Sequence, residues 1–443
     1  MAEPRRFRAA HLVALVLVAP PMVKLAEWAW PASGPKKSSA RAVAAGRELF
    51  NHDWAVNDPL SSGDGLGPVF NARSCVECHS QGGPGGGGPI EHNVTVYGLS
   101  PALLPKGRGI PPIGVVHSHA IRPEFQEMLN HVNPGLPGSP SIPLAQLVDR
   151  SRTIFPTGIT ITQRNTPALF GDGLLDAIPE DALHAEQRRN SDVARIVGLS
   201  RARDSKIRGR VARLPNGRLG RFGWKAEFAS LDDFVGAACA NELGLSNPSR
   251  QQATSLARLD YQPQGTDLSD AQCLLIGDYL RDLPAPVQVI PAEPNDKARV
   301  ANGESQFAAI GCADCHTPGL GPIRGFYSNL LLHDMGSELA SSTGYYGEPP
   351  AAPGSSGDDA PPVANEWRTP PLWGVADSGP YLHDGRAGSL EQAIALHGGE
   401  ASNVAANFAA LPQRDQDDLI AFLKSLRAPR DVNLTPMART AAR

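Results

Sequence analysis

Two short segments of the sequence repeat the pattern Cys-x-x-Cys-His, which is typical of covalent c-type haem attachment. Two thiols at this spacing can form thioether bonds to the porphyrin, and the next imidazole then lies under the iron as its proximal ligand. A tetrahedral zinc site needs four ligands, whereas this pattern supplies three. With 6 cysteines and 12 histidines among 443 residues, two chance copies are not expected. The sequence therefore predicts two haem c groups, bound by Cys75, Cys78 and His79 in one segment and by Cys312, Cys315 and His316 in the other.

The other two cysteines, Cys239 and Cys273, lie in segments that we expect to be helical, Leu231–Leu243 and Leu268–Leu283. In an oxidising compartment they could pair as a disulfide. The alternative is two unrelated buried thiols. The sequence leaves both interpretations open.

The composition limits the classes of partner. Charged residues make up 19% of the chain and the net charge is −4, so there is no basic surface for nucleic acid. The 45 glycines and 41 prolines indicate long irregular segments. Aromatic residues are only 6% of the chain, and two haems would add the large apolar surfaces that the side chains lack.

The N-terminal segment resembles an export signal. Arg5, Arg6 and Arg8 precede an apolar run, Ala9–Val23, which Lys24 ends. The run is too short to cross a bilayer comfortably, and no clear cleavage site follows it. We therefore predict that residues 1–35 are a signal peptide or an N-terminal anchor, with membrane contact only if the segment is not cleaved. Because haem thioethers form outside the cytoplasm, the predicted location is the bacterial periplasm.

The chain contains a degenerate internal duplication. Each half has, in order, a short helix, the haem motif, an Arg-(x)-Thr-Pro segment, a serine followed by an amphipathic helix, and a closing helix that ends near a proline. This pattern predicts a haem domain with insertions over 40–285, a linker over 286–297, a second haem domain over 298–430 and a tail over 431–443. The predicted opening helices are Ala42–Phe50 and Ala298–Phe307, and the last helix is Asp417–Leu426. Strand signals are scarce, with short candidates at Asn93–Tyr97 and Thr160–Thr162, so the predicted class is mainly α.

Several segments together resemble the bacterial di-haem oxidoreductase family, whose members are labelled peroxidases or thiol oxidoreductases. They are Tyr327–Gly336, Glu366–Gly374, Leu382–Glu400, Arg164–Pro179 and Gly220–Gly244. The resemblance extends from about Ala42 to Leu426. More distantly, the chain is similar to di-haem cytochrome c peroxidases and to the enzyme that matures the tryptophan-derived cofactor of methylamine dehydrogenase. The resemblance implies two cytochrome-c-like haem domains that face each other, with long loops, and a calcium ion at their interface for which no ligands are assigned.

In the peroxidases, the sixth ligand of the second haem lies 14 residues after the histidine of a Pro-Tyr-x-His-x-Gly motif. Here that motif is Pro380–Gly385, and the corresponding position is His397. The resemblance therefore implies His316 and His397 as the two axial ligands, and histidine in place of methionine lowers the reduction potential. Met335 is the rival ligand, and His397 could instead be a simple helix-end residue. Within the same motif we expect His383 to be structural and Arg386 to bind a haem propionate.

Around the first haem, Trp224 corresponds to the tryptophan that the peroxidases place between the haems, where an indole could relay electrons. The alternative is ordinary core packing. Glu242 corresponds to their distal acid, since a buried carboxylate has a raised pKa and can move protons on peroxide. A solvated helix glutamate is the alternative. We expect His92 as a candidate sixth ligand of this haem, with His117 and His119 as further candidates, or an open site.

The leading hypothesis is a periplasmic di-haem c oxidoreductase of peroxidase type. It reduces hydrogen peroxide or a similar small oxidant at the first haem, and the second haem receives electrons from a periplasmic donor protein. One alternative is an electron-transfer protein with no substrate of its own. Another is an enzyme that oxidatively modifies a partner protein.

Overall fold

The computed structural model describes residues 37–100, 102, 112–123, 126, 127, 159–197, 207–253, 263–341, 346 and 362–429. The predicted signal or anchor segment and the predicted tail after residue 430 lie outside these residues. Among the residues described, no helix is long and apolar enough to cross a membrane.

The helices account for most of the regular structure. They are α1 (Ala40–Asn51), α2 (Cys75–Cys78), α5 (Asp172–Asp176), α6 (Glu180–Val197), α7 (Leu231–Glu242), α8 (Asp270–Asp282), α9 (Pro294–Ala309), α10 (Leu390–Ala395), α11 (Ser402–Ala410) and α12 (Gln413–Ser425). The predicted helices within α1, α7, α8, α9 and α12 are confirmed. Ser39, Ser230 and Ser269 each begin a helix by accepting a backbone N–H, and Pro294 occupies the first turn of α9.

The strands are more numerous than expected. A three-stranded antiparallel sheet has the order β3-β2-β5, made of β2 (Val94–Leu99), β3 (Ile113–Val116) and β5 (Ile159–Arg164). The remaining strands form antiparallel pairs: β1 (Val69–Phe70) with β4 (His119–Ala120), β6 (Ala212–Arg213) with β7 (Leu219–Gly220), β8 (Val287–Gln288) with β13 (Leu426–Arg427), β9 (Gly319–Leu320) with β10 (Ile323–Arg324), and β11 (Leu332–Asp334) with β12 (Glu366–Arg368). Both predicted strands are confirmed within β2 and β5. The mainly-α class holds only in part, because two- and three-residue strands carry no alternating pattern that a sequence could reveal.

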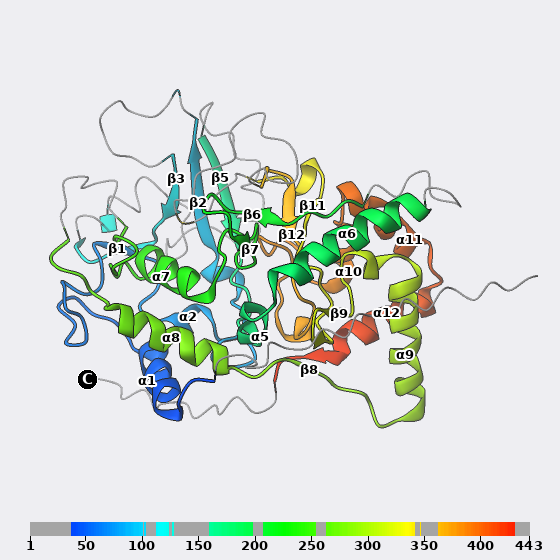
Figure 1. The fold of residues 1–443 in the computed structure, drawn as a ribbon, viewed down its shortest axis with the longest axis horizontal. Helices are drawn as coiled ribbons and strands as arrows, with labels where there is room; N and C mark the ends of the chain where they lie inside the picture. The colour runs from blue at the N-terminus through cyan, green and yellow to red at the C-terminus, as the bar shows by residue number, and fades with distance from the viewer. Residues whose placement is uncertain are drawn as a thin grey trace, which may run out of the picture.

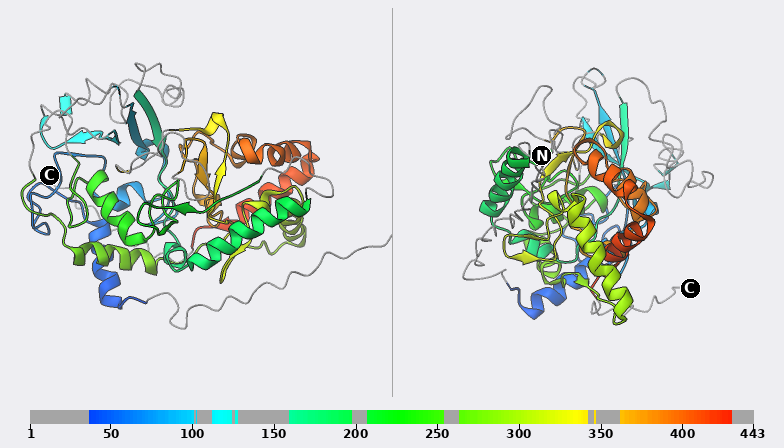
Figure 2. Two further views of the ribbon diagram at one scale, coloured as in Figure 1. Left: turned by 45° about the horizontal axis from the view of Figure 1, so that its top comes forward. Right: turned by 90° about the vertical axis from the view of Figure 1, so that its right-hand side faces the viewer.

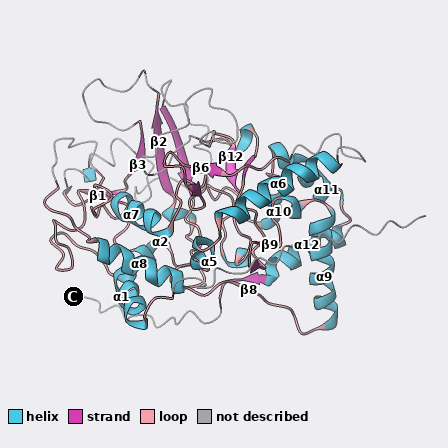
Figure 3. Cartoon of the chain, in the orientation of Figure 1, coloured by secondary structure: helices cyan, strands magenta, loops and turns pink. Residues whose placement is uncertain are grey.

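The helices gather in two groups at opposite ends of the view (Figure 1), with most of the strands drawn between them (Figure 3). Helices α1, α7 and α8 form one group, and α9 to α12 form the other. Helix α6 comes from the first half of the chain but extends along the second group (Figures 1 and 2), where the Asn190 side chain donates to the Asp314 carbonyl (2.9 Å).

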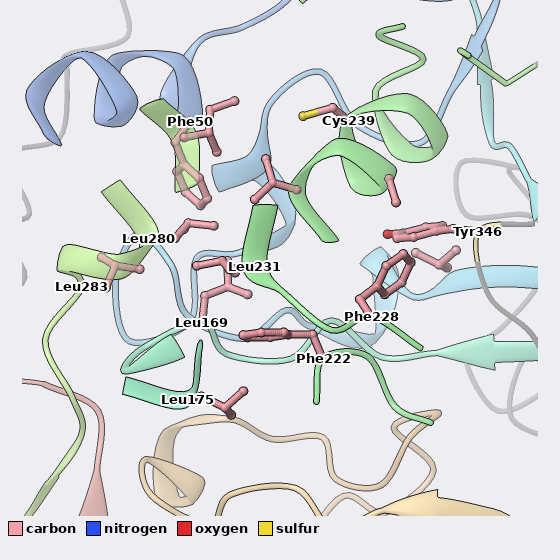
Figure 4. Close-up of a cluster of buried hydrophobic side chains, with 14 of the residues drawn as sticks. Phe50, Leu169, Leu175, Phe222, Phe228, Leu231, Cys239, Leu280, Leu283 and Tyr346 are labelled. Carbon is pink, nitrogen blue, oxygen red and sulfur yellow. The ribbon is translucent and has the colours of Figure 1, made fainter. Parts of the chain in front are cut away.

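The hydrophobic residues form two large buried clusters. The first surrounds α1, α7 and α8, and Figure 4 shows its aromatic side chains Phe222 and Phe228 near Leu231. It also includes hydrophobic residues from the second half of the chain, such as Leu320, Ile323, Phe326, Leu330 and Leu331. Among them, Phe326 packs against Trp373 (ring centroids 4.8 Å apart). The second cluster lies between α9 and α12. Within the predicted linker 286–297, β8 pairs with β13 and α9 already begins, so the domain boundaries stay a prediction.

The duplication is visible in the packing of each opening helix. Gly46 of α1 lies against the Leu275 carbonyl of α8, and Gly303 of α9 lies against the Asp418 carbonyl of α12, so closely that a Cβ would overlap either oxygen. Four residues after each glycine, Phe50 and Phe307 turn toward the haem motifs. The two helix pairs are therefore built in the same way.

Candidate functional site

The first haem motif forms helix α2 and its C-terminal end. The thiols of Cys75 and Cys78 are free, and His79 follows directly. The His79 Nδ1 atom donates to the carbonyls of Gly86 (3.2 Å) and Pro167 (3.1 Å), since both partners can only accept. Burial lowers the pKa of this imidazole to about 4. The ring is therefore neutral, with the lone pair on Nε2 free for a metal.

The glycine-rich run after this motif helps to position His79. Gly82, Gly83 and Gly85 have positive φ angles, and a Cβ at Gly86 would overlap the Gln81 carbonyl. The chain can therefore turn back sharply enough to bring the Gly86 carbonyl to the imidazole. Sequence reasoning gave this carbonyl no role, although the glycine content was visible.

A cavity of about 290 Å³ opens above the first motif. Its lining includes Phe50, both thiols and His79, together with Glu242, His92, His119 and Tyr346. Cys239 also lines it and is buried with a free thiol; Cys273 on α8 is a free thiol too, so the two are not joined by a disulfide.

Glu242 ends helix α7 with a half-buried side chain. Its Oε2 accepts a hydrogen bond from Asn71 Nδ2 (2.8 Å), while Oε1 is buried without a partner among the described residues. Burial raises the pKa of this carboxyl to about 7, and the side chains of Asn71 and Tyr346 act in the opposite direction. The side chain lines the same cavity as His79, and its role as an acid stays a prediction.

The three candidate sixth ligands of the first haem separate by position. His92 and His119 line the cavity, and the His119 ring stacks on Phe70. The His117 ring is buried elsewhere, with Nε2 bonded to the Asn241 carbonyl (2.8 Å). The structure brings two of the three histidines to the cavity, and iron ligation by either stays a prediction.

The second haem motif repeats the arrangement of the first. Cys312 and Cys315 carry free thiols, and His316 Nδ1 donates to the Tyr327 carbonyl (3.0 Å). Burial lowers the pKa of His316 to about 3, and the nearby ring of His397 contributes in the same direction. As in the first motif, a neutral ring leaves Nε2 free for a metal.

A second cavity of about 290 Å³ lies beside this motif, and both candidate sixth ligands line it. The His397 Nδ1 atom donates to the Ala393 carbonyl (2.7 Å), which leaves Nε2 free, as in His316. Met335 also lines the cavity. Sequence reasoning missed His333, which lines the cavity and bonds to Glu400 Oε2 (2.7 Å). Its only sequence signal was its place in the segment Tyr327–Gly336.

The two cavities share a wall. Thr166, Pro167, Leu169 and Phe234 line both of them. Trp224 lines the second cavity, and its indole N–H donates to the Asn165 carbonyl (2.9 Å). Pro167, two residues further along the chain, accepts the hydrogen bond from His79. Trp224 and His79 are therefore bonded to the same short backbone segment.

A protein-family match covers most of the residues described above. The family model "Di-haem oxidoreductase, putative peroxidase" matches residues 148–426, well over half of the chain. The chain belongs to this di-haem oxidoreductase family. The match includes the second haem motif, Trp224, Glu242 and His397, whereas the first haem motif lies before it.

The individual proteins that this di-haem oxidoreductase resembles match it only weakly or over a short segment. The methylamine utilization protein MauG of Methylorubrum extorquens is 31% identical over 128 residues, which cover 27% of this chain and 31% of that protein, so the chain spans about a third of its length. Hydrazine synthase of Kuenenia stuttgartiensis is 16% identical with a TM-score of 0.43, covering 96% of this chain and 100% of that one. The diheme peroxidase BthA of Burkholderia thailandensis is 15% identical with a TM-score of 0.40, covering 91% and 89%.

The guanidinium of Arg386 is bonded to Asp384 (Nη2 to Oδ2, 2.6 Å) and to the Glu338 carbonyl, and it lines neither cavity. Its predicted contact with a haem propionate stays a prediction. His383 is buried and stacks on Trp367 (ring centroids 3.7 Å apart), as expected of a structural residue.

Arg368 fits an anionic cofactor group better. Its side chain is 8% exposed and lines the second cavity; Nε donates to the Gly223 carbonyl (2.8 Å), and Nη1 is buried without a partner in the described part of the chain. Free thiol pairs, neutral imidazoles, largely apolar cavities and this cation together fit two haems.

No group of three or more His, Cys, Asp or Glu among the described residues is placed to hold a metal ion, and the predicted calcium has no assigned ligands.

Proposed function

We propose that this di-haem oxidoreductase is a periplasmic peroxidase-type enzyme. It would reduce hydrogen peroxide or a similar small oxidant in the first cavity, with electrons that a periplasmic donor protein delivers at the second. When bound, the haem groups would supply iron that binds the oxidant and stores electrons. The observation that carries the proposal is Glu242, whose carboxyl is buried in the cavity of His79 with Oε1 unbonded among the described residues.

Glu242 would move the protons of the reaction. A carboxyl with a pKa of about 7 is present in both protonation states near neutral pH. It can accept a proton from one oxygen of peroxide and return it to the leaving oxygen. The side chain of Asn71 bonds to Oε2, and Oε1 would be the oxygen available to the substrate.

The haem motifs would hold the cofactors through thioether bonds from Cys75 and Cys78 and from Cys312 and Cys315. His79 and His316 would each ligate one iron, and His397, which lines the same cavity as His316, would be a further ligand of the second. Trp224 would assist electron movement between the cavities, because it lies in the second cavity and bonds to the backbone segment that orients His79.

One observation favours the electron-transfer alternative. His92 and His119 both line the first cavity, and either could fill the sixth position of the first iron. Such a site would exclude peroxide. Oxidative modification of a partner protein stays a hypothesis that no contact in the structure distinguishes.

The test is the electronic and EPR spectrum of the ferric holoprotein, recorded before and after addition of hydrogen peroxide. We expect one high-spin and one low-spin signal, with the high-spin signal changing on addition of peroxide. Two low-spin signals that peroxide leaves unchanged would overturn the peroxidase proposal in favour of the electron carrier. A His92→Ala and a His119→Ala variant would then identify the ligand that closes the site.

A further inference from the structure

A carboxyl group that the proposed reaction does not use lies in the second cavity. Asp172 begins helix α5, directly after Gly171 in the left-handed conformation, and its partly accessible side chain lines the cavity. No hydrogen bond or ion pair of its carboxylate occurs among the described residues. Asp172 is poorly solvated in this cavity, and an unpaired carboxylate in such a place costs free energy that a bound group could offset.

Arg368 lies in the same cavity and is itself incompletely paired. Its Nε is bonded to Gly223, whereas Nη1 has no partner in the part of the chain that the structure describes. Asp172 and Arg368 act on each other electrostatically but do not form a salt bridge. Arg368 has a free N–H group at Nη1, and Asp172 gains an O–H group when it is protonated. Together they can donate two hydrogen bonds to one carboxylate ligand.

The other charges around Asp172 are already engaged. Asp176 of the same helix and Asp232 of α7 both pair with Arg281 of α8. Glu227 also acts electrostatically on Arg368, as a second anion. Arg368 of β12 is therefore the one cation that faces Asp172 in the described structure, and Glu227 shares its charge.

We propose that Asp172 and Arg368 form a binding site for a carboxylate of the second haem, a propionate, and that Asp172 takes up a proton when this haem is reduced. The proposal rests on the proposed function only in requiring a haem in the second cavity. The balance is simple: the iron gains one electron from a donor, the Asp172 carboxylate gains one proton from solvent, and the net charge of the cavity does not change. Arg368 would hold the propionate through Nη1.

The physical reason is repulsion between like charges in a poorly solvated space. Burial raises the pKa of Asp172 to about 8, Arg368 opposes this rise and Asp176 adds to it. A propionate beside it would favour the protonated carboxyl further. Below the pKa the carboxyl is neutral, which favours the reduced haem. As pH rises, Asp172 becomes negative and favours the oxidised haem, so the reduction potential falls.

The experiment is a potentiometric titration of the holoprotein between pH 6 and 10, followed by the optical spectrum, without peroxide. In the unmodified protein we expect the potential of one haem to fall across this range. In Asp172→Asn we expect that potential to stay high and nearly constant. Asp176→Asn, four residues away and outside the cavity lining, is the matched control and should retain the slope. The other haem serves as the internal reference.

A second variant keeps the test open if Asp172→Asn binds haem poorly. Arg368→Gln should lower the potential of the same haem and move its pH dependence upward, because a cation that stabilises both the reduced haem and the Asp172 carboxylate is lost. A potential independent of pH in the unmodified protein, or equal slopes in Asp172→Asn and Asp176→Asn, would overturn the proposal. These outcomes do not depend on peroxide, so a protein that lacks peroxidase activity can still confirm or contradict the site.

Discussion

The two haem sites place a phenylalanine ring in the same way beside the proximal histidine. The ring centroids of Phe50 and His79 are 6.4 Å apart in the first site, and those of Phe307 and His316 are 6.4 Å apart in the second, with similar tilts between the rings. Each proximal imidazole donates from Nδ1 to backbone carbonyls, and each lies near a helix crossing that contains a glycine. The remaining walls differ. The first cavity is lined by Glu242 and two histidines besides His79, whereas the second is lined by Asp172, Arg368 and the candidate ligands His397 and Met335. Duplication has kept the frame that holds a haem, and divergence has changed the groups that act on it.

The largest expected effect is a loss of peroxidase activity when the acid of the first cavity is removed. Glu242→Gln should lower kcat for peroxide about 100-fold or more, because a positioned acid or base contributes roughly 10²–10⁴-fold. Glu91→Gln, in the lining of the same cavity, is the control and should keep its activity. Steady-state kinetics with a reduced donor measure both. Equal losses in the two variants would show that the acid character of the cavity, rather than Glu242, matters.

The same residue predicts a pH dependence. Glu242 must be ionised to accept the first proton from peroxide, and its pKa is raised to about 7. The value of kcat/KM should therefore fall as the pH drops below about 7, and this limb should be absent from Glu242→Gln. A pH profile of the two proteins tests this. A limb that persists in the variant would assign the titration to another group.

The shared frame can be tested through its glycines. Gly46→Ala and Gly303→Ala each place a Cβ against a backbone carbonyl of the partner helix, and we expect each to cost about 1–3 kcal/mol of unfolding free energy. Gly388→Ala is the control, since its Cβ would make only ordinary contacts on an exposed residue. Denaturant titration of the holoprotein measures the three. A loss at only one of the two crossings would contradict the equivalence of the two halves.

The sequence predicted the motifs and elements whose signals lie within a few residues. It did not predict the contacts between segments that are far apart in the chain. The haem motifs, the capped helices and the strands β2 and β5 carry their signals within a few residues. Arg368 was not recognised as a candidate, because the Gly223 carbonyl that orients its side chain is far away in the sequence. Helix α6 was also missed, although Pro179 followed by Glu180 and Asp181 is a recognisable helix start.

The next prediction concerns the ligand of the second haem, for which His397 and Met335 are the candidates. His397→Met should raise the potential of one haem on the order of 100 mV, within the ~0.8 V that axial ligands span, and should alter its low-spin EPR signal. Met335→Leu should leave both unchanged, although it lines the same cavity. The opposite pattern would make Met335 the ligand and reduce His397 to a helix-end residue.

The smallest expected effect concerns the wall that joins the two cavities. Trp224→Phe keeps an aromatic ring but removes the N–H that bonds to Asn165, and we expect electron transfer between the haems to slow about tenfold, equivalent to ~1.4 kcal/mol in the barrier. Trp373→Phe is the matched control, because Trp373 lines the same cavity but packs against Phe326 and has no hydrogen bond to the segment from Asn165 to Pro167 among the described residues. Stopped-flow reduction of one haem, followed by the redistribution of electrons, separates this rate from the chemistry of peroxide. Equal slowing in both variants would mean that apolar contact alone couples the cavities. Slowing in Trp224→Phe alone would show that the coupling follows the hydrogen bond to the segment from Asn165 to Pro167.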